Sequence, residues 1–188
     1  MKTLIIGGSR SGKSSLAAQW AGQRSSSVCV IVTGVASDAE MAARIESHRR
    51  ERPAGWRVRE EPVRLGSAVE QEAATGTLVL VDCLTVWTAN CLWPGVGSAT
   101  GAVSAADCAC DLDGWRRERE GLLRALRQTR AEVILVTNEV GTGIVPDNPV
   151  VRLFRDEHGW LNQAIAAACD EVFLVTAGLP LRLKPAAP

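Results

Sequence analysis

Short runs of apolar, mostly β-branched residues recur along the chain and alternate with longer segments of helical character. Each run is continuously apolar, which is typical of strands buried on both faces of a sheet. The pattern therefore predicts an α/β fold with a mainly parallel central sheet flanked by helices. The expected strands lie at 3–6, 28–33, 78–82, 133–137 and 172–176, with a possible edge strand at 181–184.

One stretch, 93–114, departs from this pattern because it is rich in Gly, Ala and Ser. It predicts a surface loop that carries no chemistry. Cys108 and Cys110 lie within it, but no partner ligands are spaced around them, so an incidental pair of thiols is favoured over a metal site. With 188 residues, 20.0 kDa and 46% hydrophobic residues, the chain is expected to form one domain over 1–188.

Charge and composition narrow the classes of partner. The 21 basic and 21 acidic side chains cancel, so no global field draws the protein to nucleic acid or to anionic lipid, and small molecules are the expected partners. The six cysteines follow no C-x-x-C or His/Cys spacing, which favours reduced thiols. No apolar stretch approaches the length of a membrane span or signal peptide, so we expect a cytoplasmic protein without membrane insertion.

The sequence GGSRSGKS follows the first predicted strand and precedes a helical run. Gly7, Gly12, Lys13 and Ser14 fit the pattern G-x-x-x-x-G-K-[ST], which predicts a phosphate-binding loop. Glycines let backbone N–H groups converge on phosphate oxygens, and the following helix adds its positive dipole end. Lys13 would reach the β- and γ-phosphates, and the Ser14 hydroxyl is a candidate ligand of Mg²⁺.

Asp82 closes the apolar run 78–82 and is a second candidate ligand of Mg²⁺, either directly or through water. Taken alone the signal is weak, because many buried strands end in an Asp that caps the next helix. A guanine-specific switch protein is disfavoured, since Glu139 stands where such proteins carry a lysine after a late strand.

The segment 38–53 is predicted as a helix that ends near Pro53. Its residues Met41, Ile45, His48 and Arg52 share one face. The helix pattern alone favours a structural role for His48, as a partly buried histidine, over a functional role. The neighbouring arginines shift that balance, because they would screen triphosphate charge while a neutral imidazole attacks phosphorus.

His158 lies next to Gly159 at what looks like a helix break, so we expect it to be solvated at the surface. Trp20, Trp87, Trp115 and Trp160 are expected in the core or in an interface. Trp56 lies near the His48 segment, so a stacking role against a nucleobase stays open for it.

Four segments together resemble one family: GGSRSGKS, the stretch 38–60, LVLVDCLTVWTAN and TNEVGTGIVPDNPVVRLFRDEHGWLNQ. The family is the bifunctional adenosylcobinamide kinase/adenosylcobinamide-phosphate guanylyltransferase of cobalamin biosynthesis. The likeness extends from the first strand to about Lys184 and omits only 92–114. The NEVGTGIVP stretch is its most specific part.

The resemblance implies a RecA-like P-loop fold, commonly assembled as a homotrimer. It implies that ATP or GTP phosphorylates adenosylcobinamide with Mg²⁺ present, and that GMP from GTP then passes to adenosylcobinamide-phosphate through a guanylylated histidine, which matches His48. The products would be adenosylcobinamide-GDP and pyrophosphate. The catalytic residues would be His48 and Lys13, and the metal residues Ser14 and Asp82. The implied nucleotide contacts are Gly7, Gly8, Ser9, Arg10, Ser11, Gly12, Lys13, Ser14, Ser15, Thr33, Gly34, Val35, Glu51, Arg52, Pro53, Ala54, Glu60 and Asp82.

Two other functions compete with this one. The first is a single-function P-loop kinase of another small metabolite, in which His48 is structural and never traps GMP. The second is a regulatory module that senses or hydrolyses nucleotide. A trapped guanylyl group on the chain would separate the bifunctional enzyme from both.

Overall fold

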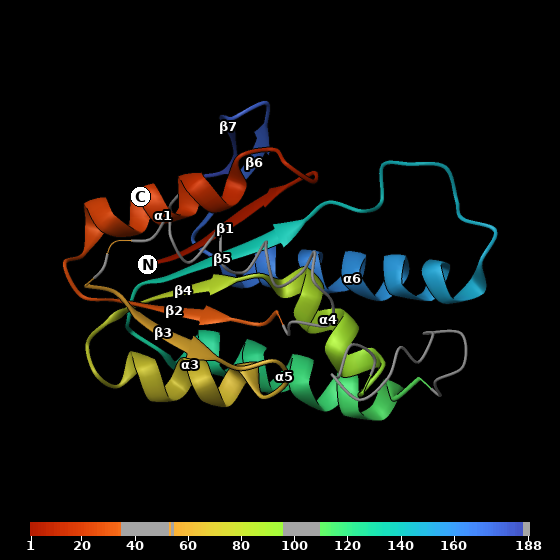
Figure 1. The fold of residues 1–188 in the computed structure, drawn as a ribbon, viewed down its shortest axis with the longest axis horizontal. Helices are drawn as coiled ribbons and strands as arrows, with labels where there is room; N and C mark the ends of the chain where they lie inside the picture. Colours follow the sequence, from red (N-terminus) through yellow and green to blue (C-terminus); the bar gives the residue numbers. More distant parts are fainter. Residues whose placement is uncertain (35–52, 54, 96–109, 186–188) are drawn as a thin grey trace.

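A computed structural model of the chain describes residues 1–34, 53, 55–95 and 110–185. Seven strands form one sheet in the order β3-β2-β4-β5-β1-β6-β7 (Figure 1). All neighbours run parallel except the last pair, β6 and β7, which is antiparallel. The strands are β1 (Lys2–Gly7), β2 (Val28–Val32), β3 (Arg57–Glu60), β4 (Leu78–Asp82), β5 (Val133–Asn138), β6 (Glu171–Thr176) and β7 (Leu179–Lys184).

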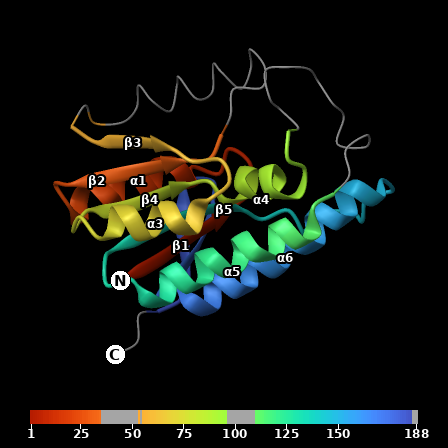
Figure 2. The same ribbon diagram turned by 90° about the horizontal axis from the view of Figure 1, so that it is seen from below.

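Helices cover both faces of this sheet. One face is covered by α1, and the other by the remaining described helices, with α5 and α6 side by side (Figures 1 and 2). The described helices are α1 (Lys13–Arg24), α3 (Leu65–Ala73), α4 (Leu84–Leu92), α5 (Leu112–Gln128) and α6 (Pro149–Ala168). The structure thus has the P-loop type of α/β architecture that the sequence predicts.

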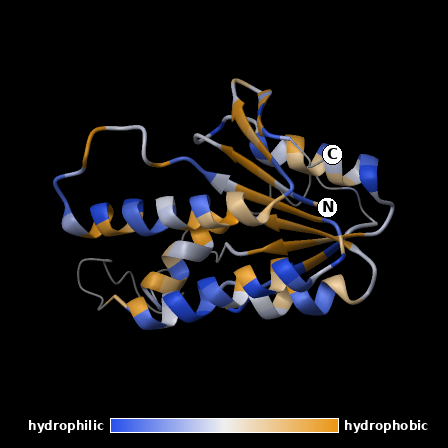
Figure 3. Cartoon of the chain, turned by 180° about the vertical axis from the view of Figure 1, so that it is seen from behind, coloured by the Kyte–Doolittle hydropathy of each residue, from blue (hydrophilic) through white to orange (hydrophobic). Residues whose placement is uncertain are grey.

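Two apolar cores follow from strand geometry, because successive side chains of a strand point to opposite faces. On β1, Leu4 packs with the helices α3 to α6, whereas Ile5 packs under α1. Coloured by hydropathy, the central strands are apolar and the helices carry mixed surfaces (Figure 3). In the larger core, the rings of Trp87 and Trp115 meet edge to face, with 5.2 Å between their centroids.

Helices α3 and α5 approach closely at a pair of glycines. A Cβ atom added to Gly66 would lie 2.6 Å from the carbonyl carbon of Gly121, so only glycine fits there. Helix α3 also packs against β2 and β4, and its Glu72 contacts the edge strand β3. Strand β3 was absent from the sequence prediction, since its sequence RVRE contains no apolar run.

All six expected strands are confirmed, including the edge strand at 181–184, which is part of β7. The predicted loop 93–114 begins where expected, since α4 ends at Leu92, although Trp93 is buried and not at the surface. Its other boundary was wrong, because α5 begins at Leu112, where the side chain of Asp111 accepts a hydrogen bond from Gly114 N. Residues 96–109 lie outside the described part of the chain.

The expectation for His158 was wrong. Gly159 does not break the helix, and His158 lies inside α6 with 0% of its surface exposed. A single helical glycine costs only ~1 kcal/mol relative to alanine, which the packing of a long helix easily overrides. Trp87 and Trp115 are buried as expected, but Trp160 is 54% exposed and is not a core residue.

The five cysteines in the described part of the chain are free thiols, as the sequence predicts: Cys29, Cys83, Cys91, Cys110 and Cys169. None of the described helices combines the length and the apolar character that crossing a lipid bilayer requires.

Candidate active site

The carboxyl ends of three neighbouring strands form the floor of the candidate site. Strand β5 lies between β4 and β1, so its end at Asn138 stands between Asp82, which ends β4, and Gly7, which ends β1. Asn138 pairs in register with Gly7, and Val136 with Asp82. Ligands of open α/β sheets bind outside this edge, so the topology places a binding site here.

The phosphate-binding loop follows β1 directly, and α1 begins at Lys13. Gly12 is the residue before the helix, and its φ of 92° belongs to the left-handed region that favours glycine. Gly7 is also required, because a Cβ there would lie 2.5 Å from the carbonyl oxygen of Val175. The N-cap residue Gly12 has no side chain to cap α1, so the first backbone N–H groups of the helix are suited to binding an anion.

Lys13 is a buried charged residue of this loop. Its Nζ donates to the carbonyl oxygen of Gly8 over 3.0 Å, so the amine folds back over the loop. Burial lowers the pKa of Lys13 from its ordinary value, and the neighbouring Cys83 and Asp82 partly oppose that effect. A buried amine at this position would gain from the negative charge of bound phosphates.

Ser14 and Asp82 are brought together as the sequence predicts. The Ser14 hydroxyl donates to Asp82 Oδ1 over 3.3 Å. Hydroxyl and carboxylate oxygens are ligands that Mg²⁺ accepts, and the ion usually takes one or two of them together with phosphate oxygens and water. This pair fits such a site, and no cluster of three or more acidic, His or Cys ligands occurs in the described part of the chain.

The turn between β6 and β7 supports the phosphate-binding loop from the other side. The N–H of Gly178 donates to the carbonyl oxygen of Ser11 over 2.8 Å. A Cβ added to Gly12 would lie 3.2 Å from Cα of Gly178, so the two backbones are in close contact. Four predicted contact residues in and next to the loop are exposed: Gly8, Ser9, Arg10 and Ser15.

Thr33 follows β2 and is buried. Its hydroxyl donates to the carbonyl oxygen of Cys83 over 2.7 Å and accepts from the N–H of Cys83 over 3.2 Å. The Thr33 carbonyl oxygen accepts from Asn90 Nδ2 over 2.8 Å. The side chain of Thr33 therefore ties the end of β2 to the segment after Asp82, and the half-buried Gly34 follows it.

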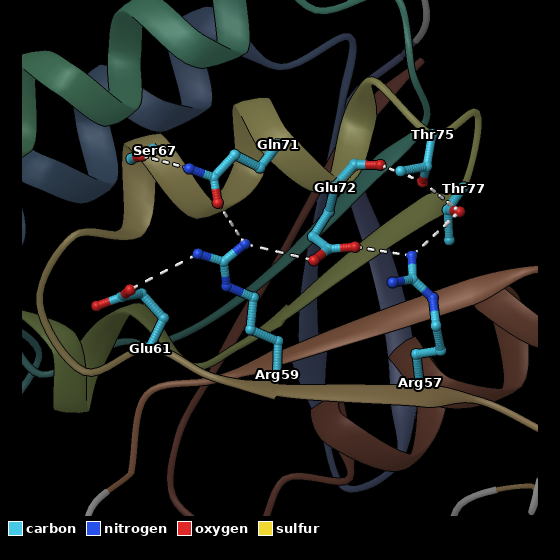
Figure 4. Close-up of polar contacts among 8 residues, drawn as sticks. All are labelled: Arg57, Arg59, Glu61, Ser67, Gln71, Glu72, Thr75 and Thr77. Carbon is cyan, nitrogen blue, oxygen red and sulfur yellow. Dashed lines mark hydrogen bonds and ion pairs between the residues drawn. The ribbon is translucent and has the colours of Figure 1, made fainter.

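Glu60 ends the edge strand β3, next to the end of β2. Arg57 and Arg59 alternate with it, so their side chains lie on the face covered by α3 and that of Glu60 on the other. Both arginines contact Glu72 of α3, at 2.7 Å from Arg57 and 3.3 Å from Arg59 (Figure 4). This bridge fixes the strand that carries Glu60. Pro53 is exposed, and His48, Val35, Glu51, Arg52 and Ala54 lie outside the described residues.

Sequence reasoning missed a buried polar network behind the end of β5. His158 of α6 contacts the hydroxyls of Thr88 and Thr137, both over 3.0 Å, and the carbonyl oxygen of Asn138 over 3.1 Å. Burial lowers the pKa of His158 to about 4, although hydrogen bonding to Asn138 and the charge of Glu139 act in the opposite direction. The imidazole is therefore neutral at pH 7.

A glycine-rich loop between the first strand and α1, with a lysine and a serine that faces an acid on β4, defines a P-loop nucleotide-binding protein. The chain belongs to the cobinamide kinase / cobinamide phosphate guanyltransferase family, whose model matches residues 3–183. It is therefore a bifunctional transferase of adenosylcobalamin biosynthesis, a kinase and a guanylyltransferase.

Curated relatives support the assignment over nearly the full length. The chain is 45% identical over 184 residues to the bifunctional adenosylcobalamin biosynthesis protein CobP of Pseudomonas aeruginosa, covering 98% of both chains. It is 38% identical over 193 residues to the bifunctional adenosylcobalamin biosynthesis protein CobU of Escherichia coli, covering 98% of this chain and 100% of the relative.

Solved structures of low identity share the fold. The flagellar accessory protein FlaH of Methanocaldococcus jannaschii matches with a TM-score of 0.51 and 13% identity, over 98% of this chain and 78% of that one. An ATPase of the type III secretion system of pathogenic bacteria matches with a TM-score of 0.56 and 12% identity, over 96% of this chain and 56% of that one. Both likenesses concern the arrangement of strands and helices.

Proposed function

We propose that this chain carries out its two transfers with separate groups: the phosphate-binding loop serves the kinase step, and His48 serves guanylyl transfer. The acceptor is adenosylcobinamide, and then its phosphate. The observation that carries the proposal is the meeting of Lys13, Ser14 and Asp82 at the ends of β1 and β4. The residues proposed to contact nucleotide are 7–15, 33–35, 51–54, Glu60 and Asp82.

In the kinase step, the loop's backbone N–H groups and the N-terminus of α1 hold the triphosphate of ATP or GTP. Lys13 leaves the Gly8 carbonyl and contacts the β- and γ-phosphate oxygens. The aminopropanol hydroxyl of adenosylcobinamide attacks the γ-phosphorus and passes its proton to solvent water. The bond to the β,γ-bridging oxygen breaks, and ADP or GDP leaves. Positioning and charge neutralisation supply most of the acceleration in such transfers.

Mg²⁺ is part of this proposal. Ser14 and Asp82 would hold it, because their oxygens already lie within 3.3 Å of each other. When bound, the ion neutralises charge on the phosphate oxygens. The chain's own residues orient it: Ser14 is the second residue of α1, and Asp82 is fixed at the end of β4.

In the second step, a neutral imidazole nitrogen of His48 attacks the α-phosphorus of GTP. A P–N bond forms, the bond to the α,β-bridging oxygen breaks, and pyrophosphate leaves. A phosphate oxygen of adenosylcobinamide-phosphate then attacks the same phosphorus and releases the imidazole. Imidazole suits both halves because it is neutral when it attacks and is protonated when it leaves.

The experiment that tests this division follows the guanylyl group on the chain. The protein is incubated with Mg²⁺ and α-phosphate-labelled GTP, denatured at alkaline pH and digested with trypsin. The expected label is acid-labile and base-stable, and it lies on the peptide 45–49 (IESHR) that contains His48. Label on the peptide that begins at Asp156, which contains His158, would contradict the proposal.

His48→Ala provides the functional comparison. This variant is expected to lose guanylyl transfer and labelling while it retains most of the kinase activity, because the phosphate-binding loop is intact. Equal loss of both activities in a folded variant would contradict the division. A wild-type protein that phosphorylates but takes no label would instead support a single-function kinase of a small metabolite.

We also propose that the chain forms a homotrimer in the cytoplasm. Support for assembly comes from the edge strand β7, whose Leu179, Leu181 and Leu183 are 73%, 60% and 56% exposed. Exposed apolar side chains in a row on a sheet edge are typical of a surface that a partner covers. Light scattering coupled to gel filtration measures the mass directly, and a monomer at micromolar concentration would contradict the assembly.

A further inference from the structure

The N–H and the carbonyl oxygen of Asn138, the residue that ends β5, both form hydrogen bonds with side chains of α4 and α6. The N–H of Asn138 donates to the Thr85 hydroxyl over 2.8 Å. Its carbonyl oxygen faces His158 Nε2 at 3.1 Å and accepts from Asn162 Nδ2 over 3.0 Å. Three side chains from two helices thus fix one backbone position, on the strand that separates the phosphate-binding loop from Asp82.

The next residue connects this position to the phosphate-binding loop. The N–H of Glu139 donates to the carbonyl oxygen of Gly7 over 3.1 Å, where β1 gives way to the loop. A displacement of the Asn138 peptide therefore displaces the Glu139 N–H and removes a support of Gly7. Gly7 has little room of its own, because it lies against the backbone of Val175.

The hydrogen bonds determine which nitrogen of His158 carries its proton. A carbonyl oxygen has no proton to give, so the contact with Asn138 requires a proton on Nε2. The Thr137 hydroxyl donates to Asn162 Oδ1 over 2.8 Å and can then only accept from Nε2. On the other side of the ring, Nδ1 lies 3.0 Å from the Thr88 hydroxyl, which also lies 2.8 Å from the carbonyl oxygen of Leu84. In the Nε2–H form, the single hydroxyl proton of Thr88 turns from Leu84 to Nδ1.

The contact with Asn138 separates the two tautomers. With the proton on Nδ1, the lone pair of Nε2 would face the lone pairs of the Asn138 carbonyl oxygen at 3.1 Å. Nε2 would then accept from the Thr85 hydroxyl, 3.4 Å away, or from the Thr137 hydroxyl, which would leave Asn162 Oδ1 without that donor. The contact between Nε2 and the Asn138 carbonyl oxygen is attractive only when Nε2 carries the proton, so the Nε2–H form is favoured. Stacking on Phe154, with ring planes 3° apart, fixes the ring's orientation.

We propose that His158, as its Nε2–H tautomer, is a positioning residue of the kinase step: it holds the Asn138 carbonyl and thereby the backbone contact between Glu139 and Gly7. The proposal rests on the proposed use of the phosphate-binding loop for phosphoryl transfer. His158 touches neither nucleotide nor acceptor and acts through the strand end alone.

Two amide substitutions test the tautomer and the role together. A glutamine amide nitrogen reaches as far along the side chain as Nε2, whereas an asparagine amide nitrogen reaches only as far as Nδ1. His158→Gln therefore keeps a donor for the Asn138 carbonyl, and His158→Asn removes it. The expected result is a kcat for phosphorylation within about threefold of wild type for His158→Gln and on the order of tenfold lower for His158→Asn.

The nucleotide KM is expected to change little in either variant, since Lys13 and the loop amides still bind phosphate. Equal kcat values for the two variants and wild type would overturn the proposal. If His158→Asn fails to fold, Thr85→Val, which removes the acceptor of the Asn138 N–H, replaces it. Thr85→Ser keeps that hydroxyl and serves as its matched control.

The tautomer is read directly from the imidazole nitrogen shifts in a long-range ¹H–¹⁵N spectrum, with His48→Ala used to assign the signals. A neutral ring protonated on Nε2 supports the proposal, and one protonated on Nδ1 overturns it. The Lys13→Ala variant distinguishes failure of the positioning role of His158 from failure of the proposed function. Loss of kinase activity in Lys13→Ala with full activity in His158→Asn refutes the positioning role alone, whereas full activity in Lys13→Ala refutes the proposed function as well.

Discussion

Acid should destabilise the folded protein through His158, and the size of the effect follows from its burial. The pKa of His158 is about 4 in the folded protein, against an ordinary value of 6.5. Between pH 6.5 and pH 4, His158 binds a proton in the unfolded chain but not in the folded protein. The free energy of unfolding therefore falls as the pH falls. Each unit of difference corresponds to about 1.4 kcal/mol, which gives about 3 kcal/mol over the whole window and about 2 kcal/mol at pH 5.

Urea unfolding at pH 7.5 and pH 5 measures this quantity when wild type is compared with His158→Gln at one protein concentration. Carboxyl groups that titrate in the same range affect both proteins alike, so their contribution cancels in the difference. We expect the free energy of unfolding of wild type, relative to the variant, to fall by about 2 kcal/mol at the lower pH. A difference that stays constant between the two pH values would refute the argument that His158 is held neutral by burial.

Three further outcomes test other parts of the structure. Gly66→Ala is expected to lower the free energy of unfolding by about 1–3 kcal/mol in urea unfolding, because its Cβ would press on the backbone of Gly121. Gly55→Ala is the control: a Cβ there meets no described atom within 4 Å, so the free energy should change by less than about 0.5 kcal/mol. Lys13→Ala is expected to raise the nucleotide dissociation constant at least about tenfold in calorimetry and to abolish phosphoryl transfer; unchanged binding would contradict its placement. Glu72→Gln should cost about 1 kcal/mol of stability, less at high salt, and a loss independent of salt would exclude an electrostatic origin.

The sequence predicts the central strands well because burial on both faces demands an unbroken apolar run. Strand β3 lacks that signal: it pairs on one side only, and it holds its place through Arg57, Arg59 and their partner Glu72 rather than through apolar packing. An edge strand fixed by long-range ion pairs has no local pattern from which to predict it.

The candidate site was predictable where it is local in sequence. The phosphate-binding loop and the pairing of Ser14 with Asp82 follow from a short motif and from the rule that parallel strands end at one edge. The sequence placed His158 at the surface because Gly159 was interpreted as a break in the helix. A signal was present, since Phe154, His158, Leu161 and Ile165 recur at helical spacing and mark the inward face of α6. Its hydrogen-bond partners come from β5 and α4, which no local pattern joins to it.

The contact between the β6–β7 turn and the phosphate-binding loop has a consequence for how the protein is made. The loop leaves the ribosome well before the Gly178 N–H that supports the Ser11 carbonyl. Strand β6, the neighbour of β1, is also synthesised late. While the elements between them are synthesised, the nascent chain therefore carries the nucleotide-binding motif without the backbone that supports it. The site is complete only when the β6–β7 hairpin docks.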